Sequence, residues 1–330
     1  MGSYILKRLL LTVFVVWAAL TLMFLLLLAV PGDAVDAKAG EKSIAAGIQA
    51  NVRRKYGLDR PIVVQYGKFF VNLAHRDLGY SIKNDRSVNT DLKETVKTSM
   101  RLLVWGGLVQ IAGSFIIGFV SAARRGSLMD SVSTVSSVVA QAVPVFVTGL
   151  LAQVFFGVIP FEKGWKWLNF NRGWPSKWHL GIFPGGGNWK GVILPAIVVG
   201  VVQMALLARL LRSSMLEVLR ADYLRTAVAK GLPRWRVLLK HALRNALIPY
   251  ITAASLALVQ IFGIAVQTER VFSLYGLGSK IAESSQIQDT PVILGLGAVV
   301  ILFTALITLV VDLSYSLIDP RIRLGEKAAK

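Results

Sequence analysis

The stretch of residues 222–249, DYLRTAVAKGLPRWRVLLKHALRNALIP, concentrates the side chains that could take part in chemistry. It holds six Arg or Lys and one His against a single acid, and the sequence on both sides is apolar and nearly uncharged. A cluster of cations attracts an anionic counterpart, such as a lipid headgroup or an acidic protein surface. No known catalytic motif accompanies the cluster, so the stretch favours binding over catalysis.

The local pattern predicts two short helices separated by Gly231. Asp222 is expected to cap the N-terminus of the first helix, and Gly231 is expected to end it in the left-handed conformation that glycine adopts without strain. Pro233 suits the first turn of the second helix. The first helix is rich in small residues that would let another protein approach closely: Thr226, Ala227, Ala229 and Gly231.

The second helix is expected to have an apolar face and a basic face. The apolar face is formed at helical spacing by Trp235, Leu238, Leu239, Ala242 and Ala246. The basic face is formed by Arg236, Lys240 and Arg244. Like charges at that spacing repel one another, so this face favours an anionic counterpart. The residues leave two interpretations open, a helical hairpin on lipid headgroups or a docking element for a cytoplasmic subunit, and the glycine break with its small residues favours docking.

The elements that must position this stretch are membrane helices. The chain of 330 residues is 54% hydrophobic with a mean hydropathy of +0.59, which exceeds the apolar share of soluble domains. A helix needs about 20 apolar residues to cross a bilayer core. Runs of about that length without Asp, Glu, Lys or Arg occupy 9–30, 102–123, 131–161, 191–208, 245–268 and 290–311. The sequence therefore predicts an all-α polytopic membrane protein with six transmembrane helices.

The formal net charge of +19 indicates the orientation of these helices. Positively charged short loops stay in the cytoplasm. With a cytoplasmic N-terminus, the segments on that side hold seventeen Lys or Arg, and the two short loops on the other side hold seven. Both termini and the stretch 222–249 are therefore predicted to be cytoplasmic. The charge is expected to attract anionic membrane lipids and no nucleic acid, because no basic-aromatic module lies in one folded segment.

The predicted boundaries divide the chain into four parts. Residues 1–30 form the first helix, 31–100 a small extracytoplasmic segment, and 319–330 a cytoplasmic tail. The transmembrane core, 101–318, contains the stretch 222–249 and helices at about 101–123, 131–161, 191–212, 245–268 and 290–318. Pro144 and Pro160 are expected to kink and end the long third helix. The loop 162–190 is rich in Trp, and Trp165, Trp167, Trp174 and Trp178 favour anchoring at the membrane interface over contact with a soluble partner.

Several predicted spans carry glutamine. Its side chain is costly in lipid, so the glutamines should face other helices or a water-filled path. Five occur: Gln110, Gln141, Gln153, Gln203 and Gln260. Gln141, Gln203 and Gln260 are candidates for a translocation path, although hydrogen bonding between helices explains the group equally well. The chain has no Cys, no Walker loop and three His that all lie outside the spans. These observations predict a non-catalytic chain that binds no cofactor or metal.

The stretch 222–249 resembles the EAA loop of ABC-importer permeases, in the variant found in dipeptide and oligopeptide permeases. That variant reads YxRTAxAKGLxxxxVxxxHxLRNAxxP, and the matching residues here run from Tyr223 to Pro249. Arg225 and Thr226 stand where the general motif has Glu and Ala. The resemblance covers nearly the whole chain and is closest to the first of the two permeases in such systems. It includes VPGD at 30–33, YGLDRPIVVQY at 56–66, DLGYSI at 77–82, LPAIVVG at 194–200, TERVFSLYGLGSKI at 268–281 and VVDLSYSLIDPRIR at 310–323.

The resemblance implies a type I ABC-importer permease fold in the bacterial inner membrane and the transport of di- or oligopeptides. It implies three kinds of partner: a second homologous permease, two ATPase subunits that bind ATP and Mg, and an extracytoplasmic peptide-binding protein. It further implies that the first helix of the stretch is a coupling helix and that 233–248 carries its movement to the fifth span. The residues that would contact the ATPase are Tyr223, Arg225, Thr226, Ala227, Ala229, Lys230, Gly231 and Leu232.

Several alternatives stay open at this point. The same family transports nickel and other small solutes, so a permease for such a solute is an alternative. The loop 162–190 is longer and richer in Trp than the resemblance leads us to expect, which leaves the docking of a binding protein open. An intramembrane enzyme would need a nucleophile and a base within a span, and the positions of the His residues argue against it. A stand-alone channel would need no partner subunits.

Overall fold

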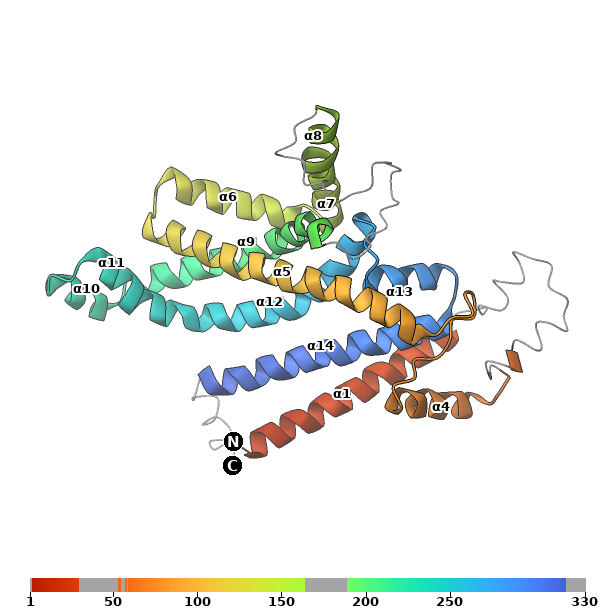
Figure 1. Cartoon of the computed structure of the whole chain (residues 1–330). Helices are drawn as coiled ribbons and strands as arrows, with labels where there is room; N and C mark the ends of the chain where they lie inside the picture. The colour runs from red at the N-terminus through yellow and green to blue at the C-terminus, as the bar shows by residue number, and fades with distance from the viewer. Residues whose placement is uncertain (1, 30–52, 55–56, 58, 164–188, 319–330) are drawn as a thin grey trace. The chain divides into compact units, whose positions relative to one another are not determined.

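The computed structural model describes residues 2–29, 53–54, 57, 59–163 and 189–318 (Figure 1). The expectations for the Trp-rich loop, for most of 31–58 and for the tail 319–330 lie outside these residues. The described residues are helical and include one isolated antiparallel bridge, Tyr80–Ser87. This confirms the predicted all-α class.

The helices are α1 Gly2–Ala29, α4 Ile62–Ala74, α5 Val88–Ala123, α6 Leu128–Ala142, α7 Val145–Gln153, π-helical η1 Val154–Val158, α8 Ile159–Glu162, 3-10 helix η2 Trp189–Val192, α9 Ile193–Val218, α10 Asp222–Ala229, α11 Arg234–Arg236, π-helical η3 Val237–Ala242, α12 Leu243–Val271, α13 Leu277–Gln286 and α14 Thr290–Ile318.

Five helices of the described chain are long and apolar enough to cross a membrane, and a bent helix pair makes a sixth if it counts as one span. That pair is α6 followed by α7 and η1, with a bend of 106°. Pro144 causes the bend as predicted, because Val143 before it is extended and α7 begins directly after it. The expectation that Pro160 ends the helix is wrong, since α8 continues through Pro160 to Glu162.

The helix bounds agree with the sequence at α1 and α14 and differ elsewhere. The helix expected at 101–123 begins at Val88, and the polar residues of its first turns are buried, among them Asp91, Thr95 and Ser99. The helix expected at 191–212 continues to Val218. The helix expected at 245–268 is part of one helical stretch, Arg234–Val271, because η3 joins α11 to α12 without a break.

The chain forms two compact units, one of Met1–Ser99 with Tyr275–Val310 and the other of Met100–Leu274 with Val311–Lys330. In the first unit, the buried carboxylate of Asp289 lies between α13 and α14. It accepts hydrogen bonds from Ser81 Oγ at 2.5 Å and from the backbone N–H of Ile82 at 3.1 Å. This carboxylate therefore attaches the turn around residues 80–87 to the start of α14.

Lys280 of α13 is a buried cation of the same unit. Its Nζ donates to Glu283 Oε2 at 3.1 Å and lies 5.8 Å from the centre of the Tyr275 ring. Burial lowers the pKa of Lys280, but the bond to Glu283 and the fields of Tyr275 and Asp91 outweigh burial, so its pKa is raised from the ordinary value. The side chain therefore stays charged.

The core of the second unit lies where α5, α9 and α12 run side by side (Figure 1). Its buried residues include Leu207 and Leu211 of α9 and Tyr250 and Ala254 of α12. The Tyr250 hydroxyl hydrogen-bonds to Ser114 Oγ of α5 at 2.8 Å, so a polar contact between helices accompanies the apolar core.

Glycines bring α5 and α9 into close contact. A Cβ at Gly118 of α5 would lie 2.7 Å from the carbonyl oxygen of Ala208 in α9. A Cβ at Gly200 of α9 would lie 2.6 Å from the Cβ of Val109 in α5. Both distances are shorter than carbon contacts allow, so the two backbones approach each other because these positions lack side chains.

Gly118→Ala is expected to destabilise the isolated subunit in detergent by about 1–3 kcal/mol, because α5 and α9 would have to separate. Gly263→Ala in α12 is the matched control, since a Cβ there meets no atom within 4 Å. The control should be neutral or stabilising by up to about 1 kcal/mol, since alanine favours the helix. The measurement is the thermal unfolding temperature, and equal temperatures for the two variants would contradict the close contact.

Candidate functional site

The first part of the candidate site is α10 of the second unit. Ala221 occupies the N-cap position and makes no side-chain cap, so the expectation that Asp222 caps the helix is wrong. Asp222 is instead the first helical residue. Its carboxylate lies 3.4 Å from Arg225 Nη1, and its backbone carbonyl accepts a hydrogen bond from the Thr226 hydroxyl at 3.2 Å.

The turn after α10 ends the helix at Gly231, as the sequence predicts. Gly231 has a φ of +75°. Its N–H donates to the carbonyl of Val228 at 2.9 Å, and the N–H of Leu232 donates to the carbonyl of Ala227 at 3.4 Å. This pair of bonds is the Schellman motif. A Cβ at Gly231 would meet no atom within 4 Å, so the backbone conformation, and not crowding, requires glycine here.

Exposure divides the predicted contact residues of α10 into two groups. Ala227 is buried beside the buried Leu224, and Leu232 is half-buried, so these side chains face their own chain. The small size of Ala227 therefore serves internal packing. The other predicted residues are exposed and can meet a partner: Tyr223, Arg225, Thr226, Ala229, Lys230 and Gly231.

The second helix of the stretch differs from its predicted pattern. Trp235 and Leu239, expected on the buried face, are 60% and 48% exposed, while Val237 and Ala242 are buried. The cause is the π-helical turn of η3, which spaces the buried Val237 and Ala242 five positions apart and rotates the preceding residues outward. The residues of the predicted basic face are exposed as expected: Arg236, Lys240 and Arg244.

Three contacts connect this stretch to the helices of the second unit. Asn245 Nδ2 donates to the Tyr223 hydroxyl at 2.7 Å and joins α10 to α12. Arg234 Nη2 donates at 2.9 Å to the carbonyl of Ala123, the last residue of α5, where a cation complements the helix dipole. Leu224 belongs to the same buried cluster as residues of α9 and α12. A displacement of α10 would therefore also displace α12.

The second part of the candidate site lies on α9, where the structure brings together the three candidate glutamines and one arginine. Gln203 Nε2 of α9 donates to Gln260 Oε1 of α12 at 3.1 Å. Arg209 Nη2 of α9 donates to Gln141 Oε1 of α6 at 2.7 Å. Leu206 lies between Gln203 and Arg209 on the outward arc of α9 and is 46% exposed. We call Gln141, Gln203, Leu206, Arg209 and Gln260 the polar stripe.

The remaining two glutamines of the spans have different surroundings. Gln153 Nε2 of α7 donates to the carbonyl of Val271 in α12 at 2.8 Å, so it links two helices. Gln110 of α5 is fully buried, and neither atom of its amide has a hydrogen-bond partner among the described residues. With the Gln203–Gln260 and Gln141–Arg209 bonds, the structure supports the interpretation that most of these glutamines hydrogen-bond to other helices.

From the sequence, Arg209 was counted only as a positive charge near the membrane surface. Its position directly after the charge-free run 191–208 could have marked it as a candidate site residue. A guanidinium is costly against lipid, so protein or water should cover the outward face of α9. The stripe offers amides and a guanidinium, which can bind a polar or anionic solute by hydrogen bonds. No cluster of His, Asp or Glu that could hold a metal ion occurs in the part of the chain that the structure describes.

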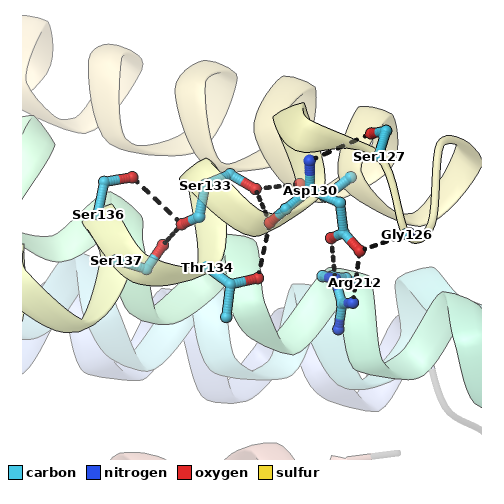
Figure 2. Close-up of polar contacts among 9 residues, drawn as sticks. Gly126, Ser127, Asp130, Ser133, Thr134, Ser136, Ser137 and Arg212 are labelled. Atoms are coloured by element: carbon cyan, nitrogen blue, oxygen red, sulfur yellow. Dashed lines mark hydrogen bonds and ion pairs between the residues drawn. The ribbon is translucent and has the colours of Figure 1, made fainter.

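An ion pair that the sequence analysis missed anchors the stripe (Figure 2). Arg212 of α9 binds the buried carboxylate of Asp130 in α6 through two bonds, Nε to Oδ1 at 2.5 Å and Nη2 to Oδ2 at 2.8 Å. The backbone N–H of Gly126 donates to the same carboxylate at 3.0 Å, and Ser127 Oγ accepts from the Asp130 N–H at 3.3 Å. The only signal in the sequence was an acid directly before the apolar run 131–161.

Asp130→Ala is expected to destabilise the subunit by about 3–5 kcal/mol, because Arg212 would remain partly buried without its counter-ion. The double variant Asp130→Ala/Arg212→Leu should recover part of that loss, since it removes the unpaired charge as well. Chemical unfolding of the purified subunit in detergent measures both. Equal stabilities for the single and double variants would show that the pair does not act as described.

Comparisons with known proteins match nearly the whole chain. Residues 114–324 match the family model described as "Binding-protein-dependent transport system inner membrane component". Residues 1–102 match the model described as "Binding-prot-dependent transport system membrane comp, N-term". Together the two models extend over both compact units.

Curated relatives are similar over nearly their full lengths. The dipeptide transport system permease protein DppB of Alkalihalophilus pseudofirmus is 35% identical, over 98% of this chain and 100% of that protein. The probable D,D-dipeptide transport system permease protein DdpB of Escherichia coli K12 is 34% identical, over 95% of each chain. DppB of the same strain is 33% identical, over 98% of this chain and 99% of that protein. The chain therefore belongs to the family of binding-protein-dependent inner-membrane transport components, as an ABC permease of the Dpp type.

Proposed function

We propose that this chain is the transmembrane permease subunit of an ATP-driven importer of di- and oligopeptides. The names of relatives that are 33–35% identical over nearly their whole lengths support the substrate class. In the proposed assembly the chain pairs with a second homologous permease, and each permease forms half of the translocation path. Two partner ATPases bind and hydrolyse ATP with Mg, and an extracytoplasmic peptide-binding protein delivers the substrate.

The proposed topology follows the charge of the loops. The chain crosses the bacterial inner membrane several times, both termini are cytoplasmic, and 31–100 faces the other side. The α10 surface then lies in the cytoplasm, where the ATPases are. This chain contributes the path and the coupling element, and the chemistry of ATP hydrolysis belongs to the ATPases.

The observation that carries the proposal is the long helical stretch that connects α10, through the turn at Gly231, to a membrane span. After the turn at Gly231, one helical stretch runs for 38 residues from Arg234 to Val271. At 1.5 Å per residue it is about 57 Å long, which exceeds a bilayer core of about 30 Å. The stretch therefore projects from the membrane toward α10 and can carry a displacement into the span.

We assign α10 as the coupling helix. Its exposed residues would meet the ATPase, while Ala227 and Leu232 would hold the helix against its own chain. When the ATPases close, α10 would move with them, and the Tyr223–Asn245 bond and the packing of Leu224 would pass that movement to α12. The Gln203–Gln260 contact lies between α9 and α12, so a shift of α12 would change the polar stripe. Access to the path would thereby switch from one side to the other.

Gly231→Val tests the coupling assignment. A β-branched residue at a φ of +75° costs about 1–2 kcal/mol and would distort the turn that orients α10. Peptide uptake by proteoliposomes that contain the whole transporter is expected to fall about tenfold or more, while ATP hydrolysis persists.

Gly79→Val is the matched control for that experiment. Gly79 has a φ of +88°, and a Cβ there meets one atom within 4 Å, Pro291 Cβ at 3.9 Å, but the residue belongs to the first unit and lies in the turn before α5. The control should carry the same local strain and retain uptake. Equal uptake by the two variants would remove the coupling assignment for α10.

A further inference from the structure

We propose that the polar stripe contains a subsite for the C-terminal carboxylate of the transported peptide, and that Arg209 binds this carboxylate. The inference rests on the proposed peptide-import function and adds a recognition element to it. Its starting point is a difference between two neighbouring arginines of α9. Arg212 is neutralised by Asp130 through two bonds, whereas Arg209 hydrogen-bonds to the neutral amide of Gln141. Among the described residues, no Asp or Glu forms an ion pair with Arg209.

The geometry leaves the Arg209 guanidinium available to a ligand. A guanidinium has five N–H donors, and the bond to Gln141 uses one donor atom, Nη2. The fork of the remaining donors matches the two oxygens of a carboxylate. The bond to Gln141 also limits the motion of the side chain, so little conformational freedom would be lost on binding. Arg209 therefore has the charge, the donors and the orientation of an anion-binding residue.

The position of Arg209 in α9 favours a ligand over a role on the protein surface. Arg209 follows the charge-free run 191–208 directly, and nine further residues of α9 follow it, up to Val218. The face of α9 that carries Gly200 and Ala208 packs against α5, and Arg209 reaches from α9 to Gln141 of α6. A guanidinium that adjoins the apolar run and has no acidic partner among the described residues is costly against lipid. A polar path that an anionic solute enters would remove this cost.

The spacing along the stripe matches a short peptide. Gln203 and Arg209 are six residues apart, a rise of about 9 Å along the helix. Two extended residues span about 7 Å. With its carboxylate on Arg209, a dipeptide would bring its peptide bond toward the amides of Gln203 and Gln260. Its apolar side chains would lie over Leu206, which is exposed between the two.

This arrangement makes the free carboxylate the recognised feature. Glutamine amides both donate and accept hydrogen bonds, so they can pair with any peptide bond. Leu206 contacts apolar side chains without selecting among them closely. Arg209 alone among the five stripe residues carries a charge, so it would distinguish a free C-terminus from a neutral one. The substrate class is therefore short peptides with a free C-terminal carboxylate.

Photolabelling of the complete transporter in membrane vesicles tests the subsite. The probes are two forms of one alanyl dipeptide with a diazirine side chain, one with a free carboxylate and one with a C-terminal amide. In Arg209→Gln, the half-saturating concentration of the carboxylate probe should rise about tenfold or more. The amide probe should label Arg209→Gln and the wild type alike. Arg209→Lys keeps the charge without the fork, so it should shift the carboxylate probe by a smaller factor and leave the amide probe unchanged.

Arg124→Gln is the matched control. It removes one exposed arginine from the turn between α5 and α6, and both probes should label it as they label the wild type. Assembly is checked by co-purification with the ATPases. If Arg209→Gln does not assemble, the comparison of the two probes on Arg209→Lys decides.

The following results would overturn the subsite. Labelling of Arg209→Gln that equals the wild type, or that falls equally for both probes, would assign Arg209 to a contact with the second permease or with an anionic lipid. A wild type labelled by neither probe would overturn the peptide-import function together with the subsite. Labelling of the wild type with no selective loss in the variant would overturn the subsite alone.

Discussion

The second unit depends on the fixed orientation of α9 about its own axis, which two contacts determine. On one side, Gly200 and Ala208 press against the glycine-lined surface of α5. On another side, Arg212 is held to the buried carboxylate of Asp130 in α6. A helix fixed in two directions by close packing and by a buried ion pair cannot rotate without losing one of them. Leu206 is therefore left exposed on α9, with Gln203 bonded to Gln260 of α12 and Arg209 bonded to Gln141 of α6.

The same packing explains how α10 is connected to the membrane helices. Leu224 of α10 and Val237 of η3 join the buried cluster that contains Leu211 and Tyr250. The π-helical turn lets Val237 and Ala242 both reach this cluster, although they are five positions apart. π-helical turns recur at functional positions because they shift the register of a helix. Here the shift turns Trp235 outward and keeps α11 continuous with α12.

Much of the fold could be predicted from the sequence, because bilayer spans require long apolar runs. The charge-free runs located α1, α9, α12 and α14, and Pro144 located the bend in the third. The first turns of α5 were missed because Asp91, Thr95 and Ser99 look like loop residues. They are helical because the first unit buries them, and local propensity does not report such burial. The exposed face of η3 was also missed, since a regular helical period cannot contain a π turn.

For the candidate site, the sequence by itself determined the residue types and the chain boundaries of the basic stretch, including the glycine that ends α10. Glycine at that position carries its own conformational signal, so no other part of the chain was needed to interpret it. Only the tertiary structure decided that Ala227 faces inward, that Arg212 pairs with an acid and that Arg209 pairs with a neutral amide. It also decided that Gln203 of α9 meets Gln260 of α12 and that Gln141 of α6 meets Arg209 of α9. Those facts depend on contacts between residues as many as 82 positions apart, and the rotation of α9 that creates them is set by packing against α5 and α6.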